Sequence, residues 1–176
     1  MKKIIVLCLW MVSVTGFTQN TEMDLELQQK LEALVNDFKG DVGIYVKNLE
    51  TDKEIAINAD TIFPTASIVK VPILVKVFDK IEKGELNYND TLVYSTDRIY
   101  GGSGLMQFYK DSTKTDLRTL VALMISYSDN VTSLWNQELA GGGEAINELM
   151  NEIGLEHTRV NSRTEGREKD WEKYGW

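Results

Sequence analysis

The 176-residue sequence contains very little cysteine and histidine, with one residue of each. Cys8 therefore cannot form a disulfide within one chain, and a zinc site built from clustered Cys and His ligands is excluded. Blocks of basic residues are also absent, since 19 Lys and Arg stand against 27 Asp and Glu, for a formal net charge of −8. This balance argues against general binding to nucleic acid or to anionic membranes.

An apolar run from Ile4 to Val12 lies near the N-terminus and is too short to span a bilayer as a stable helix. Lys2 and Lys3 precede the run, and small or short residues follow it, which is typical of a secretory signal peptide. We predict a signal peptide over residues 1–18, export to the periplasm or secretion, and no stable membrane anchor. Cys8 lies within the run rather than after it, which argues against a lipoprotein.

Apolar residues make up 43% of the chain and charged residues 26%, which is typical of a globular protein. We predict one α+β domain over residues 19–176. Apolar periodicity and turn residues predict helices and a hairpin; the helices cover residues 21–38, 67–83, 117–127, 131–139 and 144–153, and the strands 42–46 and 54–58. The helix over 67–83 is apolar nearly all round, so we expect it to be central and buried. Only two strands are visible, and residues 87–114 and 161–176 show no clear period.

Ser67 and Lys70 are three residues apart at the start of this apolar helix. The spacing places both side chains on one face, about one turn apart. Burial disfavours the cationic form of a lysine and lowers its pKa, so that Lys70 could accept the proton of Ser67. The helix N-terminus adds positive potential that suits a developing oxyanion. The alternative is a helix cap followed by a surface lysine.

Ser128-Asp129-Asn130 lies between two predicted helices. All three residue types cap helices, so a cap cluster is the alternative interpretation. Together with the upstream Ser-x-x-Lys, however, the tripeptide is part of a known signature of serine enzymes, whose third part is Lys-Thr-Gly. That third part is absent here, because the only Lys-Thr precedes Asp116 and lies upstream of Ser128.

The segment from Phe63 to Pro72 resembles the nucleophile region of the class A serine β-lactamase and penicillin-binding protein-like serine hydrolases. Ser128-Asp129-Asn130 resembles the second motif of that family, and Arg163-Thr164-Glu165 is similar to the start of its Ω-loop. The similarity runs over most of the chain after the leader, from Gly43 to Glu165.

The resemblance implies a role for each matching residue. Ser67 would be the acylated nucleophile and Lys70 its proton partner. Ser128 would relay a proton to the leaving β-lactam nitrogen, and Asn130 would hydrogen-bond both the substrate's side-chain amide and Lys70. Glu165 would act as the general base that activates the deacylating water. The resemblance implies no metal and no other cofactor.

Three departures from the family pattern surround Glu165. Lys169 occupies the place of the asparagine that normally helps to hold the water. Gly166 stands where a proline is common, and Glu168 is a rival carboxylate. A solvated loop charge is therefore the alternative interpretation of Glu165.

The resemblance also implies a fold in which a helical part lies beside a five-stranded antiparallel sheet. Since the sequence stops shortly after the Ω-loop region, we expect this chain to lack the C-terminal strands and the closing helix. The predicted function is a serine hydrolase that opens β-lactams and confers antibiotic resistance, monomeric when complete, with a β-lactam or peptidoglycan-like substrate. The alternative is a penicillin-binding, DD-peptidase-like or catalytically inert cell-wall-binding relative.

Other candidate sites have weaker support. His157 follows a helix stop, where an ordinary chain segment is expected rather than a triad base. The run Gly101-Gly102-Ser103-Gly104 lacks the lysine of a phosphate-binding loop, so we predict a loop at the rim of the cleft. The acidic C-terminal stretch lacks the ligand spacing of a calcium loop.

Overall fold

The computed structural model describes residues 22–175, so the predicted signal peptide over residues 1–18 lies outside the described residues. These residues form two compact units, which divide between Thr61 and Ile62. No helix within residues 22–175 combines the length and the apolar character that a membrane crossing needs.

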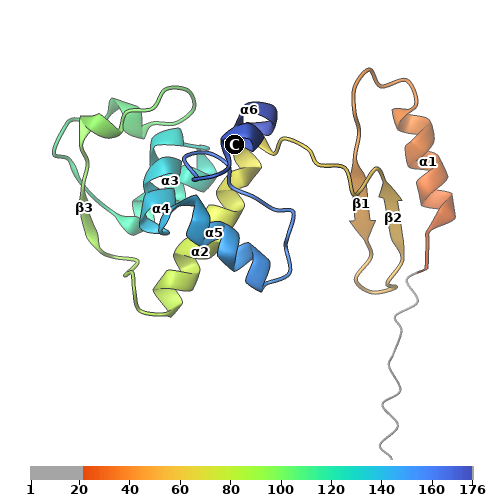
Figure 1. Ribbon diagram of the computed structural model, residues 1–176, viewed down its shortest axis with the longest axis horizontal. Helices are drawn as coiled ribbons and strands as arrows, with labels where there is room; N and C mark the ends of the chain where they lie inside the picture. The colour runs from red at the N-terminus through yellow and green to blue at the C-terminus, as the bar shows by residue number, and fades with distance from the viewer. Residues whose placement is uncertain (1–21, 176) are drawn as a thin grey trace, which may run out of the picture. The chain divides into compact units, whose positions relative to one another are not determined.

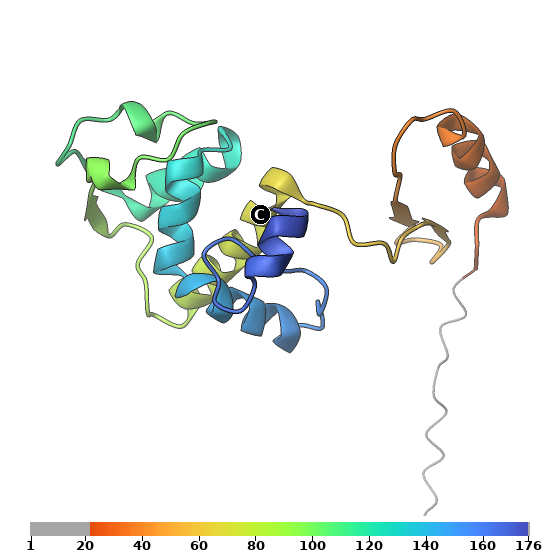
Figure 2. The same cartoon turned by 45° about the horizontal axis from the view of Figure 1, so that its top comes forward.

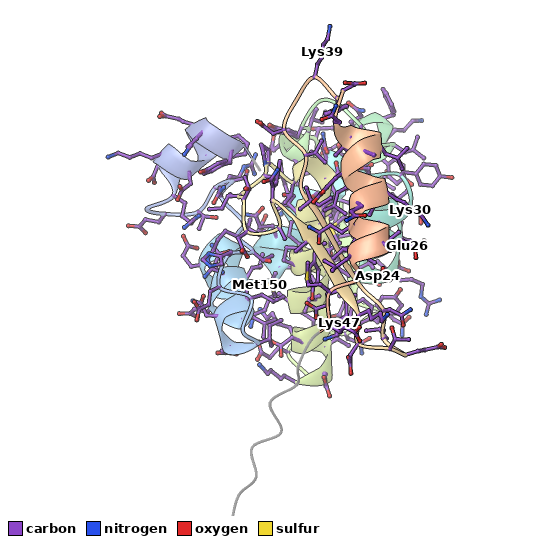
Figure 3. All side chains as sticks on the ribbon, turned by 90° about the vertical axis from the view of Figure 1, so that its right-hand side faces the viewer. Asp24, Glu26, Lys30, Lys39, Lys47 and Met150 are labelled. Atoms are coloured by element: carbon purple, nitrogen blue, oxygen red, sulfur yellow. The ribbon has the colours of Figure 1, made fainter. Side chains whose placement is uncertain are left out.

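The first unit contains helix α1 (Leu25–Val35) and a hairpin of strands β1 (Ile44–Lys47) and β2 (Glu54–Ile57). Helix α1 starts at Asp24, whose carboxylate accepts a hydrogen bond from the backbone N–H of Leu27 at 3.0 Å and so satisfies one free N–H of the first turn. Figure 3 labels Glu26 and Lys30 on this helix and Asp24 at its start. The observed helix is shorter than the predicted one over residues 21–38.

The predicted hairpin is confirmed. β1 and β2 pair in antiparallel register, with Lys47 opposite Glu54, and their side chains form an ion pair of 2.9 Å. The turn is held by the Asn48 side-chain oxygen, which accepts hydrogen bonds from the backbone N–H groups of Glu50 and Thr51.

The second unit is mainly helical and contains the predicted functional residues. Its helices are α2 (Lys70–Glu82), α3 (Leu117–Ser126), α4 (Asn130–Leu139), α5 (Gly142–Glu152) and α6 (Glu168–Tyr174). Helices α2, α4 and α5 pack on one another, and α3 packs on α4 (Figures 1 and 2). Two clusters of buried apolar side chains fill the space between the helices; their members include Ile73, Val77, Val121, Met124 and Ile146 in one, and Tyr94, Met106, Leu120, Val131 and Trp135 in the other.

The prediction of a long helix that is buried all round is wrong in two respects. Ser67 lies in a 3₁₀ turn, η1 (Ala66–Val69), and the α-helix begins only at Lys70. In α2, Ile73 is fully buried, whereas Val71 and Phe78 are 51% and 44% exposed. The apolar residues outside the buried stripe therefore face outward in the described chain.

Several short elements escaped the sequence analysis. Strands β3 (Thr91–Val93) and β4 (Lys114–Asp116) form a second two-stranded antiparallel sheet. Three residues are too few to show the alternation on which strand prediction depends. Two 3₁₀ turns, η2 (Thr96–Arg98) and η3 (Met106–Phe108), lie in the same segment. Helix α6 lies in the C-terminal stretch for which no period was visible.

Candidate active site

Ser67 and Lys70 form the first half of the candidate site. Ser67 is exposed, whereas Lys70, at the first position of α2, is only 3% exposed. Lys70 Nζ donates a hydrogen bond to Ser67 Oγ over 3.4 Å. An accessible hydroxyl is thus held beside a buried amine.

Ser128 and Asn130 form the second half, at the junction of α3 and α4. Lys70 Nζ donates to the Ser128 carbonyl oxygen at 2.6 Å and contacts Ser128 Oγ at 2.9 Å. It also donates to Asn130 Oδ1 at 3.0 Å. The two motifs, nearly sixty residues apart, therefore meet at one amine.

The surroundings of Lys70 change its affinity for a proton. Burial lowers the pKa of Lys70, and the nearby Asp129 carboxylate raises it by a smaller amount. The net effect is a lowered pKa, which increases the fraction of neutral amine at a given pH.

The partners of Lys70 allow it to act as a base towards a hydroxyl. The Ser128 carbonyl and Asn130 Oδ1 can only accept hydrogen bonds, so they engage two N–H bonds. The remaining side of the nitrogen faces the hydroxyls of Ser67 and Ser128, which can both donate and accept. A neutral Lys70 can therefore direct its lone pair towards a hydroxyl proton.

Asp129 holds the turn between these groups. Asp129 is fully buried. Its carboxylate accepts hydrogen bonds from the backbone N–H groups of Leu105, Met106 and Thr132 at 2.6, 2.7 and 2.9 Å. The bond from Thr132 caps α4. Asp129 thus ties the start of α4 to the 105–106 segment.

Glu165 is placed differently from the other four predicted residues. It is exposed, and its backbone N–H donates to the Glu144 carboxylate at 2.6 Å. Within residues 22–175, no hydrogen bond joins the Glu165 carboxylate to Ser67 or Lys70. The rival Glu168 accepts a hydrogen bond from the Gly166 N–H at 3.2 Å, and Lys169 is exposed.

The glycine-rich segment 101–104 was predicted to lie at the rim of a cleft, and it does contact the site. Asn130 donates from its backbone N–H to the Ser103 carbonyl at 3.0 Å and from Nδ2 to the Gly101 carbonyl at 3.1 Å. Sequence reasoning missed these partners, because carbonyl groups carry no sequence signal.

His157 is exposed and lies after α5.

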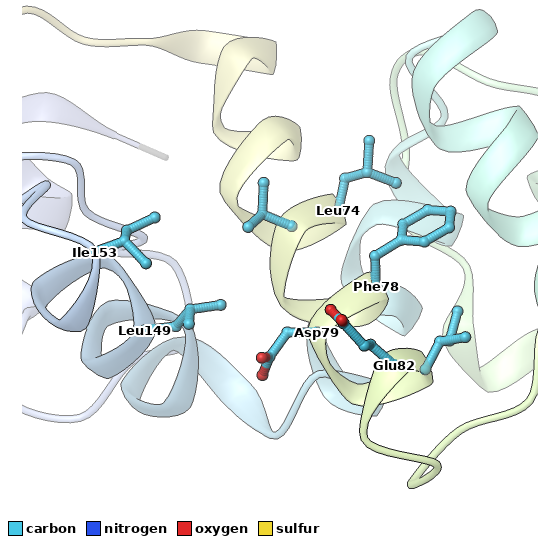
Figure 4. Close-up of a pocket in the computed structure, with 8 residues that line it drawn as sticks. Leu74, Phe78, Asp79, Glu82, Leu149 and Ile153 are labelled. Carbon is cyan, nitrogen blue, oxygen red and sulfur yellow. The ribbon is translucent and has the colours of Figure 1, made fainter.

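A groove of about 580 Å³ lies elsewhere on the second unit, between α2 and α5 (Figure 4). Its lining is mostly apolar and includes Leu74, Phe78, Leu149 and Ile153. None of the five predicted site residues lines it. Among the described residues, no three His, Cys, Asp or Glu side chains converge to hold a metal ion.

Known proteins with similar sequences cover most of this chain. It is 26% identical over 155 residues to the extended-spectrum beta-lactamase PER-1 of Pseudomonas aeruginosa. This alignment covers 86% of this chain and 50% of the relative. It is 27% identical over 151 residues to an imipenem-hydrolyzing beta-lactamase of Enterobacter cloacae, covering 85% and 50%. The chain thus spans about half the length of these relatives.

Solved structures give the same result for the fold. The structure of PBP-A superimposes with a TM-score of 0.76 at 29% identity, covering 81% of this chain and 54% of that one. A mutant of PBP-A with the same TM-score is an acyl-enzyme complex with penicillin G. The fold of the described chain is therefore that of part of a β-lactamase or penicillin-binding protein, as predicted. The model of the Beta-lactamase enzyme family matches residues 26–174, and this chain belongs to that family.

Proposed function

We propose that the protein is a serine hydrolase that opens the β-lactam ring through acylation of Ser67. The observation that carries this proposal is the contact of Ser67 Oγ with a buried lysine amine of lowered pKa. A serine hydroxyl becomes a useful nucleophile when an adjacent base takes its proton. The β-lactamase relatives support the choice of substrate class.

In the proposed acylation, Ser67 Oγ attacks the carbonyl carbon of the β-lactam while its proton passes to Lys70. The carbon–nitrogen bond of the ring then breaks. Ser128 Oγ, 2.9 Å from Lys70 Nζ, relays the proton to the leaving nitrogen. The product is an ester between Ser67 and the opened ring, while Asn130 binds the substrate's amide.

In the proposed deacylation, Glu165 takes a proton from a water molecule that attacks the ester carbonyl. The carbon–oxygen bond to Ser67 breaks, Ser67 recovers its proton, and the opened β-lactam leaves as an acid. Such a function would confer antibiotic resistance on an organism that exports the protein to the periplasm. Export itself remains a proposal from the leader sequence.

The test is covalent labelling of the full chain by penicillin G, followed by intact mass and peptide mapping. We expect one adduct of the mass of penicillin G, located on the peptide that contains Ser67. Ser67→Ala should remove the adduct, and Lys70→Met should slow its formation by about 10²–10⁴-fold, the usual contribution of a general base. Ser112→Ala is the matched control, because it removes another exposed serine hydroxyl of the same unit, one that donates to Asp111 and contacts no residue of the site. An adduct on Ser67→Ala would contradict the proposal.

A second candidate is a penicillin-binding protein that stays acylated. The exposed Glu165 carboxylate, which has no hydrogen bond to Ser67 or Lys70 among the described residues, favours this candidate. The lifetime of the adduct separates the two functions. A β-lactamase loses the adduct quickly, and Glu165→Gln should then prolong it; a penicillin-binding protein keeps it, and Glu165→Gln changes nothing.

A further inference from the structure

The glycine loop, residues 101–104, lies directly against Asn130. Besides the two hydrogen bonds that Asn130 donates to the loop carbonyls of Gly101 and Ser103, the Gly102 backbone lies close to the Asn130 side chain. A Cβ atom added to Gly102 would lie 2.7 Å from Asn130 Nδ2, and Gly102 has a φ of +104°. Both the space and the backbone conformation therefore require glycine.

The Gly101 carbonyl determines which way the Asn130 amide points. A carbonyl oxygen only accepts hydrogen bonds, so the amide must present Nδ2 to it. Asn130 Oδ1 then faces Lys70 Nζ, 3.0 Å away. If the amide turned over, Nδ2 would meet the amine hydrogens of Lys70, and a donor would face a donor. The position of the Gly101 carbonyl thus decides whether Lys70 has an acceptor at this point.

Gln107 holds the glycine loop in its shape. Its Nε2 donates to the Gly102 carbonyl at 2.9 Å and to the Gly104 carbonyl at 3.0 Å, which uses both hydrogens of the amide. Gln107 projects from η3, and this turn is anchored by Met106, which is fully buried and donates its N–H to Asp129. The anchored turn η3 therefore holds the glycine loop in place through Gln107, because the loop itself has few side chains that could pack.

We propose that Gln107 is a positioning residue of the candidate site, whose side-chain amide fixes the glycine loop so that Gly101 orients the Asn130 amide towards Lys70. The part of this proposal that concerns the acylation rate rests on the proposed function. The part that concerns Asn130 and Lys70 does not, so the two are tested by separate measurements.

The first measurement is NMR of the ¹⁵N-labelled full chain carrying Gln107→Met, which keeps the size of the side chain and removes its donors. Hydrogen exchange of the Asn130 side-chain amide should become about tenfold faster, the effect of losing one ordinary hydrogen bond. Lys70 should titrate at lower pH, because its cation loses an acceptor while the facing charged group, Asp129, is unchanged. Gln29→Met, on an exposed residue of α1, is the control and should change neither signal.

General loosening of the unit would give a different pattern. The backbone amide of Trp135, buried in the middle of α4, should keep its exchange rate in Gln107→Met. The proposal is overturned if Asn130 and Lys70 behave as in the wild type, or if Trp135 exchange accelerates as much as Asn130 exchange. Gln107→Leu, which also lacks the two donors and adds no charge, should give the same result and replaces Gln107→Met if that variant does not fold.

The second measurement is the rate of adduct formation with penicillin G. Gln107→Met should slow it by about 10- to 100-fold, as expected when a reacting group is displaced slightly. If the wild type forms no adduct while the NMR changes appear, the proposed function fails and the positioning role stands. If the NMR signals change but the adduct forms at the wild-type rate, the orientation of Asn130 does not matter for acylation, and that part is overturned.

Discussion

Lys70 lies closer to Ser128 than to Ser67: its Nζ is 2.6 Å from the Ser128 carbonyl and 2.9 Å from Ser128 Oγ, but 3.4 Å from Ser67 Oγ. The amine is therefore held mainly by the turn before α4, and only loosely by the residue three positions before it. In the proposed acylation, such a loose contact would leave Ser67 free to move towards the carbonyl of the β-lactam. Catalytic contacts of this kind are often long before a substrate binds.

The buried lysine should make stability depend on pH. The pKa of Lys70 is lowered from 10.5 by burial, so the unfolded chain holds this proton more tightly than the folded chain. Stability then rises with pH between the lowered pKa and 10.5. We expect the free energy of unfolding of the wild type, relative to Lys70→Met, to increase across this range. Denaturant titrations of both proteins from pH 7 to 10.5 measure it, and a flat or falling difference would contradict the prediction.

Replacing Asp129 should destabilise the second unit far more than replacing another capping aspartate. Asp129→Ala leaves three backbone N–H groups of a buried turn without their acceptor, at about 3 kcal/mol or more. Asp116→Ala removes the cap of α3, in which the carboxylate accepts a hydrogen bond from the Thr119 N–H at 2.7 Å, at about 1 kcal/mol. Denaturant midpoints of the two variants give the comparison, and equal losses would show that Asp129 acts only as a cap.

A methyl group at Gly104 should be tolerated much less well than one at Gly154. Both residues have positive φ, +120° and +81°, so alanine is strained at either by about 1–2 kcal/mol. At Gly104, however, the added Cβ would lie 2.3 Å from the Asp129 carboxylate, whereas at Gly154 it would meet nothing within 4 Å. We expect Gly154→Ala to melt a few degrees below the wild type and Gly104→Ala to lose the cooperative transition of the second unit. Similar melting curves for the two would be the opposing result.

The ion pair between Arg98 and Glu138 should contribute little at neutral pH and nothing in acid. The hydrogen bond from Arg98 lowers the pKa of Glu138 below 4.5. Its contribution is therefore complete above about pH 4.5 and is lost as the pH falls through the lowered pKa. Since the Glu138 side chain is 62% exposed, Glu138→Gln should cost only about 0.5 kcal/mol at pH 7. The free energies of unfolding of the wild type and Glu138→Gln should converge at low pH. A difference between them that widens in acid would contradict this prediction.

Local signals allowed part of this structure to be predicted. Asp116 and Asp129 stand directly before apolar-periodic runs, and both are N-caps in the structure. The pairing of Ser67 with Lys70 also follows from a spacing of three. The contact between Lys70 and Ser128 does not, because nothing in either segment specifies a partner so far along the chain. Resemblance to a known family placed the two motifs in one active site.

The features that the sequence did not predict also have specific physical causes. Val71 and Phe78 are apolar, and composition alone suggested that α2 is buried on all sides, but burial depends on what packs against a face. The three-residue strands β3 and β4 depend on each other for pairing and have no pattern of their own. The orientation of Asn130 depends on the carbonyl of Gly101, a group that every residue carries.

Ser128 has a left-handed backbone conformation, with a φ of +52°. At this position the residue that is best for stability therefore differs from the residue that is best for the proposed function. Glycine at this position would relieve about 1 kcal/mol of strain, yet it would remove the hydroxyl that Lys70 contacts. Ala66, next to Ser67, has a φ of +45°, and glycine there would relieve similar strain without removing any polar group. A library selected only for thermal resistance should therefore accumulate glycine at both positions. A library selected for activity as well should accept it at position 66 alone.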